Sequence, residues 1–229
     1  MPLREDYEER KKQVEDYLIF LKGIERSTAL PQVTPVQQKI LYASAYLLLY
    51  NLIESTVTNC GKELDGTLSE ISVAQLRNLT EAIRLHWLKH TSQYNKSEDK
   101  RLQGIQDLYD KLLDTTSLLE IKFDFDGTGN LDNKKIEEIM SKYGINTTMS
   151  RELETKIKKH VLDNMGTLQT IKHYRNALAH GEKSFAECGE HSVDKIQEIA
   201  NTVFEYLEFI IGQIEDFIRD EKYLIGTNP

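Results

Sequence analysis

Residues 192–220 carry the feature that constrains the fold most, an uninterrupted helical pattern of apolar side chains. Apolar residues recur there at alternating spacings of three and four: Val193, Ile196, Ala200, Val203, Leu207, Ile210, Ile214 and Phe217. This spacing places them on one face of a single long helix, which other helices must cover. Phe204, Ile211 and Ile218 widen that face beyond what one neighbour needs, so we expect a subunit interface to use the excess.

Similar patterns earlier in the chain predict an all-α fold. We expect helices near residues 3–26, 35–58, 73–90, 98–116, 132–143 and 149–163, and one more after Gly166. Residues 119–125 break the series, because apolar and polar side chains alternate there in the manner of a short strand. We therefore expect one domain, residues 1–229, built as an up-and-down helical bundle. Residues 119–146 would form an irregular or short-strand insertion in it.

Composition and charge exclude several classes of protein. A net charge of −8 argues against a general nucleic-acid coat protein, although a local basic cleft is compatible with it. Cys60 and Cys188 form no spacing motif, so we expect reduced thiols and a cytoplasmic protein. No signal peptide is recognisable, and the apolar run Ile40–Ile53 is shorter than the roughly 20 residues of a membrane span. We expect that run to be a buried helix and no membrane to be a partner.

Neither of two candidate metal sites is convincing. Residues 124–132 resemble the start of a calcium loop, but Lys135 stands where a bidentate glutamate is needed, so we favour a polar turn. His86 and His90 share a helix face without a further ligand nearby in sequence, so we favour a packing or surface role. Phosphate-cradling glycine loops, Ser-His-Asp signatures and dinucleotide fingerprints are also missing. We therefore predict neither a metal nor a cofactor.

The helix after Gly166 places a cation in its apolar face. Leu168, Ile171, Arg175 and Leu178 follow one another at helical spacing, so Arg175 occupies a slot that faces the core. A guanidinium in such a position must pair with an acceptor group or take part in the protein's function. Glu54 lies in the apolar stripe of the predicted helix 35–58, and we expect it to hold Arg175.

The end of the same helix carries an imidazole. His180 precedes Gly181, a residue type common just after a helix end. The Arg-to-His spacing alone is weak evidence, since Arg84 and His90 show a similar one. The surroundings are more informative: a polar residue follows the arginine, small apolar residues fill the middle, and a long amphipathic helix comes next.

The stretch Arg175-Asn176-Ala177-Leu178-Ala179-His180 resembles the Arg-polar-x-x-x-His motif of the HEPN superfamily. The run at 46–54, Tyr-Leu-Leu-Leu-Tyr-Asn-Leu-Ile-Glu, and the long C-terminal helix are also similar to MAE-type HEPN-like nucleases. The resemblance implies a HEPN-like bundle and a metal-independent endoribonuclease, usually a homodimer in which two motif copies form one cleft. It also implies a toxin or phage-defence effector, with an antitoxin or a neighbouring defence protein as a possible partner.

The residue chemistry is compatible with RNA cleavage. A guanidinium can grip a phosphate in a bidentate manner, and an imidazole can accept or donate a proton near neutrality. We expect Arg175, Asn176 and His180 to be catalytic, with attack of the ribose 2′-OH on the adjacent phosphate. Lys172, His173 and Lys183 would add positive charge for RNA. The alternative is a catalytically silent HEPN module that binds RNA, a nucleotide or a partner protein, with Arg175 and His180 in structural roles.

Overall fold

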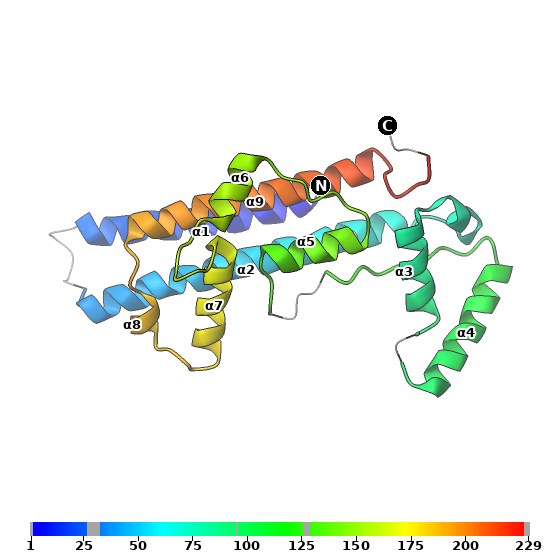
Figure 1. The fold of residues 1–229 in the computed structure, drawn as a ribbon, viewed down its shortest axis with the longest axis horizontal. Coiled ribbons are helices and arrows are strands. Elements are labelled where there is room, and N and C mark those ends of the chain that lie inside the picture. The colour runs from blue at the N-terminus through cyan, green and yellow to red at the C-terminus, as the bar shows by residue number, and fades with distance from the viewer. Residues whose placement is uncertain (1, 27–32, 95, 126–128, 227–229) are drawn as a thin grey trace. The chain divides into compact units, whose positions relative to one another are not determined.

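The computed structural model describes residues 2–26, 33–94, 96–125 and 129–226, and within them the chain is helical without a sheet. The elements, labelled in Figure 1 where there is room, are α1 Pro2–Arg26, α2 Pro35–Leu68, the 3-10 helix η1 Val73–Asn78, α3 Glu81–Thr91, α4 Glu98–Leu113, α5 Asn133–Lys142, α6 Arg151–Lys158, α7 Thr167–Ala179, α8 Phe185–Cys188 and α9 Val193–Arg219. The all-α prediction is confirmed.

The residues group into two compact units whose segments alternate along the chain. Unit 1 contains Met1–Val57, Asp126–Ile136 and Thr148–Ile211, and unit 2 contains Thr58–Phe125, Glu137–Thr147 and Gly212–Pro229. The helices α2, α5 and α9 contribute to both units. The single domain expected from the sequence stays a prediction, and each unit is described by itself below.

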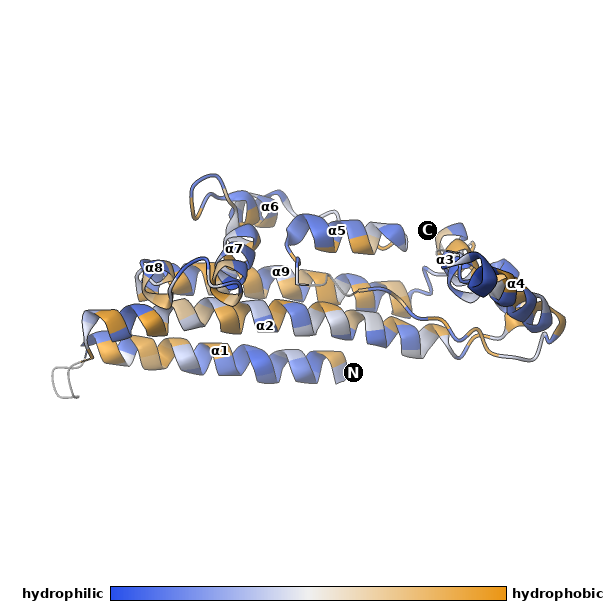
Figure 2. Ribbon diagram, turned by 90° about the horizontal axis from the view of Figure 1, so that it is seen from below, coloured by the Kyte–Doolittle hydropathy of each residue, from blue (hydrophilic) through white to orange (hydrophobic). Residues whose placement is uncertain are grey.

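In unit 1, α1 lies beside α2 and α9 and is antiparallel to both (Figures 1 and 2). The Tyr17 hydroxyl donates to the Leu41 carbonyl at 2.8 Å, and the Tyr7 hydroxyl donates to the Phe204 carbonyl at 3.3 Å. Phe204 and Ile211 are buried within the chain itself. Ile218 is half-buried. Two of the three residues that we expected to be left over for a subunit interface are therefore covered within the chain, and the interface itself stays a prediction.

The helix α2 is longer than predicted, since it continues past residue 58 to Leu68. Leu64 and Leu68 are fully buried, which explains why the helix extends that far. By length and composition α2 could cross a membrane, and a buried core helix meets the same criteria. Tyr46, Leu49 and Ile53 are fully buried in unit 1, as expected for a core helix.

In unit 2, residues 119–125 are extended but belong to no sheet, so the short strand is wrong and the irregular alternative is right. The alternation is real: Leu119, Ile121, Phe123 and Phe125 are buried, and the residues between them are exposed. In place of a second strand, groups on a neighbouring helix and the adjoining turn form hydrogen bonds with backbone N–H groups of this segment. The Leu119 N–H donates to the Ile71 carbonyl at 2.9 Å, and the Phe123 N–H donates to the Asp65 carboxylate at 2.6 Å.

The helix predicted at 73–90 is divided into η1 and α3. The Gln75 side chain accepts from the Ser72 N–H at 3.3 Å and so forms part of a capping box at the start of η1. The chain then becomes extended at Leu79, and the Thr80 N–H donates to the Tyr223 carbonyl at 2.8 Å. A contact with the C-terminal segment thus interrupts the expected helix.

The candidate metal sites gain no support from the part of the chain that is described. Asp126, Gly127 and Thr128 of the calcium-like loop lie outside the described residues. Asp132 directly precedes α5, and its carboxylate accepts from the Lys135 N–H at 3.0 Å. Among the described residues, no cluster of three or more His, Cys, Asp or Glu side chains is arranged to hold a metal ion.

Candidate functional site

The helix α7 carries the predicted motif, and it runs across the long helices of unit 1 (Figure 1). Gly166 precedes it at a close approach, since an added Cβ would lie 2.5 Å from the Ile157 carbonyl oxygen. Leu168 and Ile171 are fully buried and fix the helix on unit 1. The helix ends at Ala179 with His180 as its C-cap, and Gly181 follows at φ +69°. The predicted helix end is confirmed.

The guanidinium of Arg175 is half-buried and held from several sides. Its Cζ lies 4.7 Å from the centroid of the Tyr50 ring, within the range of a cation–π interaction. Its Nη1 donates to the Asn176 amide oxygen at 2.9 Å and reaches the Gly129 carbonyl oxygen at 3.5 Å, at the limit of a hydrogen bond. These contacts orient the guanidinium.

The ion pair expected between Arg175 and Glu54 is not found among the described residues, and this expectation is corrected. Tyr50 lies one turn before Glu54 on α2, and its ring occupies the position beside the guanidinium. Tyr50 is also tied to the 129–132 segment, because its hydroxyl accepts from the Leu131 N–H at 3.3 Å. Glu54 itself is half-buried.

The residues predicted to bind RNA differ in how their charges are used. Lys172 forms an ion pair with Asp132, a carboxylate that is only 7% exposed, so its charge is already compensated within the chain. The Lys183 Nζ lies 5.9 Å from the centroid of the Tyr174 ring, and the His173 ring is 5.8 Å from that ring. Their role in RNA binding stays a prediction.

The structure brings Asn176 to Arg175 but does not bring His180 to them. His180 is exposed, and within the described residues no hydrogen bond or ring contact joins it to Arg175. Side chains five positions apart on a helix are rotated by about 140°, so divergence is expected. A site that uses both groups needs a second copy of the motif or a moved helix end.

An aromatic cluster behind the motif was not predicted from the sequence. The rings of Tyr46 and Tyr174 are 4.7 Å apart, and His191 Nδ1 lies 2.5 Å from the Tyr46 hydroxyl. Burial raises the pKa of Tyr46 and lowers the pKa of His191. The hydroxyl therefore donates to a neutral imidazole. Both tyrosines lie on apolar helix faces and could be recognised as core residues, but no sequence pattern points to His191.

Comparison with known proteins adds a family to this geometry. The model of the HEPN_MAE_28990-like HEPN family matches residues 2–223, which is nearly the whole chain. The match includes residues 119–146, which we expected to be an insertion relative to a minimal bundle. No curated protein matches the chain. No solved structure matches it.

Proposed function

Because the chain belongs to the HEPN_MAE_28990-like HEPN family, we propose that it is a metal-independent endoribonuclease that acts as a homodimer. HEPN membership suggests a nuclease-like module, and the Arg-x4-His stretch 175–180 gives that module a specific chemistry. We further propose that the protein is a cytoplasmic toxin or phage-defence effector, controlled by an antitoxin or by a neighbouring defence protein.

The proposal rests mainly on the position of the Arg175 guanidinium, which neighbouring groups hold near the exposed end of α7. Arg175 is held by Tyr50, Asn176 and Gly129, so little ordering is needed when it meets a phosphate. His180 is exposed at the end of the same helix, where an RNA strand can reach it. A positioned cation and an imidazole together supply charge stabilisation and proton transfer.

The proposed reaction is transesterification within the RNA strand. The ribose 2′-oxygen attacks the adjacent phosphorus while one His180 imidazole takes the hydroxyl proton. The bond from phosphorus to the 5′-oxygen breaks, and the imidazolium formed in the first step gives that oxygen its proton. The products are a 2′,3′-cyclic phosphate and a 5′-hydroxyl. Arg175 offsets the charge that develops on the phosphate oxygens, and Asn176 acts as a positioning residue for Arg175.

Cleavage of RNA by purified protein in excess EDTA tests this mechanism. His180→Ala should lower the rate by roughly 10²–10⁴-fold, since it removes a general acid–base. His160→Ala, which removes another exposed histidine of unit 1, should leave the rate unchanged. A 2′-deoxy substitution at the scissile nucleotide should stop cleavage. A need for a divalent ion, or cutting of the 2′-deoxy substrate, would contradict the mechanism.

One observation favours the silent binding module as a second candidate. Arg175 directs its Nη1 into acceptors of its own chain, Asn176 and Gly129, as a structural arginine would. In that case the protein binds RNA without forming product, and Arg175→Ala lowers stability without changing RNA affinity. Cell growth provides a second readout: a toxin arrests growth when expressed, and His180→Ala relieves the arrest.

A further inference from the structure

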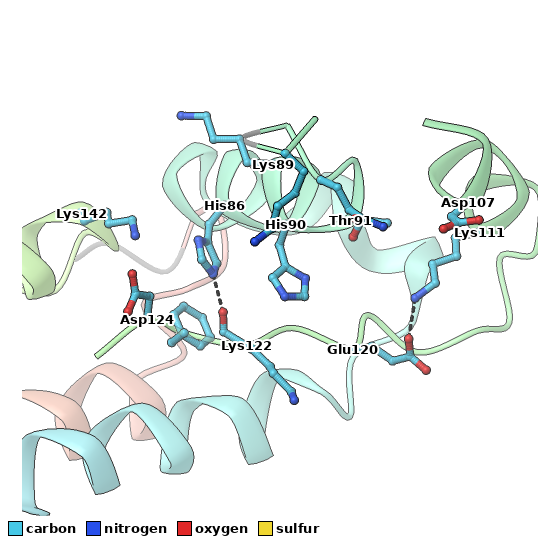
Figure 3. Close-up of a pocket in the computed structure, with 13 residues that line it drawn as sticks. His86, Lys89, His90, Thr91, Asp107, Lys111, Glu120, Lys122, Asp124 and Lys142 are labelled. Carbon is cyan, nitrogen blue, oxygen red and sulfur yellow. Dashed lines mark hydrogen bonds and ion pairs between the residues drawn. The ribbon is translucent and has the colours of Figure 1, made fainter. Parts of the chain in front are cut away.

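Unit 2 contains a hollow of about 950 Å³ between α3, α4 and the extended residues 120–124 (Figure 3). We call it the unit 2 hollow. His86 and His90 project from α3 toward the extended segment, and Asp107 and Lys111 come from α4. Small-molecule sites have volumes of about 300–1,000 Å³, so the hollow is large enough for a ligand of nucleotide size.

The charge of the unit 2 hollow is opposite to that of the whole protein. Its lysines are Lys89, Lys96, Lys111, Lys122 and Lys142, and its carboxylates are Asp107, Glu120 and Asp124. Lys111 pairs with Glu120, whereas in the described part of the chain Lys89, Lys96 and Lys122 pair with no carboxylate. A chain of net charge −8 thus gathers unpaired cations around one cavity. Such an arrangement attracts anionic ligands.

One wall of the unit 2 hollow is aromatic. The rings of His86 and Phe123 are stacked with centroids 5.3 Å apart, and the Tyr143 ring meets His86 edge-on at 4.9 Å. His86 Nε2 donates to the Lys122 carbonyl oxygen at 2.6 Å, and burial lowers the pKa of this imidazole. His86 is therefore a neutral ring with one nitrogen already used. This supports the packing role that the sequence favoured over zinc.

We propose that the unit 2 hollow binds a phosphate-bearing nucleotide. The unpaired lysines hold phosphate oxygens through charge-assisted hydrogen bonds, and the partly exposed ring of His86, which is stacked on Phe123, receives the base. The same chemistry suits a free nucleotide and a nucleotide unit of an RNA strand. The site shares no residue with the 175–180 motif, so it stands whether or not the chain cleaves RNA.

The test is a binding measurement on the full chain with separate probes. ATP, inorganic tripolyphosphate and a short 2′-O-methyl RNA, which has no 2′-OH to react, are titrated by calorimetry at constant ionic strength. The double variant Lys89→Gln/Lys122→Gln removes two unpaired cations of the hollow. The matched control Lys62→Gln/Lys100→Gln removes two exposed lysines of unit 2 that do not line it. A thermal unfolding measurement checks that both variants are folded.

We expect ATP to bind more tightly than tripolyphosphate, because the base adds a contact. The hollow variant should weaken ATP binding about tenfold or more, and the control should change it less than about twofold. If only the RNA probe binds and only the hollow variant weakens it, the site holds and its ligand is an RNA strand. Absence of binding by every probe, or equal weakening in both variants, would overturn the proposal.

Discussion

Arg175 illustrates how a half-buried charge is accommodated at the scale of one residue. Its guanidinium lies over the face of the Tyr50 ring, and one of its N–H groups donates to the amide oxygen of Asn176. An aromatic face and an amide oxygen together replace much of the hydration that burial removes. The remaining donors of the guanidinium fork are what a phosphate would use.

Arg175→Lys tests whether RNA cleavage needs the planar N–H donors of the guanidinium or only its positive charge. The ammonium keeps the cation near Tyr50 but loses the planar donors, so RNA cleavage should fall by roughly ten- to a hundredfold. Arg151→Lys, at an exposed arginine of the same unit, is the control and should leave the rate unchanged. Full activity in Arg175→Lys would show that a point charge is sufficient there.

His191 provides a pH prediction at the same scale. Its pKa is lowered in the folded chain, chiefly by burial and also by Lys195, whereas an unfolded histidine titrates near pH 6.5. Below about pH 6.5 the unfolded chain therefore binds a proton that the folded chain resists, and the free energy of unfolding falls as the pH falls. His191→Asn should flatten this dependence below about pH 6.5, measured by denaturant unfolding. An unchanged slope would show that His191 titrates normally.

At this scale, the motif could be predicted from the sequence, but the residues that contact Arg175 could not. Arg175 and His180 were placed correctly on the helix and at its end. Tyr50 and Glu54 occupy the same face of α2 one turn apart, and periodicity cannot decide which of them meets α7. That choice depends on where two helices cross, which is set by the packing of the whole unit.

At the scale of elements, residues 129–132 contact α7, the helix that carries Arg175, and Tyr50 on α2. The Gly129 carbonyl oxygen accepts from the Arg175 guanidinium, and the Leu131 N–H donates to the Tyr50 hydroxyl. The Asp132 carboxylate forms an ion pair with Lys172. Gly129 has φ +77°, and an added Cβ would lie 2.8 Å from Arg175 Nη1. The segment therefore helps to set the position of the guanidinium.

Gly129→Ala and Gly144→Ala separate this effect from backbone strain. Gly144 has nearly the same φ, +76°, but an added Cβ there meets nothing within 4 Å. Both variants should lose about 1–2 kcal/mol of unfolding free energy, because alanine is strained at positive φ. Only Gly129→Ala should displace the guanidinium and reduce RNA cleavage. Equal activity in the two variants would contradict a role for this segment in the site.

The helices were predictable to the extent that their signals are local. Gly166 and Gly181 mark the limits of α7, and the apolar spacing at 192–220 predicted α9 closely. Residues 119–125 show why other elements were not. Alternating burial reports an extended segment with one buried side, but it does not say whether another strand or a helix accepts its hydrogen bonds.

At the scale of the whole molecule, the proposed active site needs two copies of the chain. Phe204 and Ile211 on the wide apolar face of α9 are buried within one chain, so these two residues do not favour a dimer. The positions of Arg175 and His180 favour a dimer, because the two side chains diverge on one helix and a composite cleft would bring them together. Light scattering on purified protein tests the dimer, and a monomer at catalytic concentrations would remove the basis of the composite site.

The most direct test of the central claim is the RNA cleavage rate of a mixed dimer. Chains carrying Arg175→Ala and His180→Ala are co-expressed with different affinity tags and purified through both. If the motif of each chain completes that of the other, the mixed dimer retains one intact Arg175 and one intact His180. It should then cleave RNA at least about tenfold faster than either parent variant. A rate no higher than that of the two parents would contradict the account.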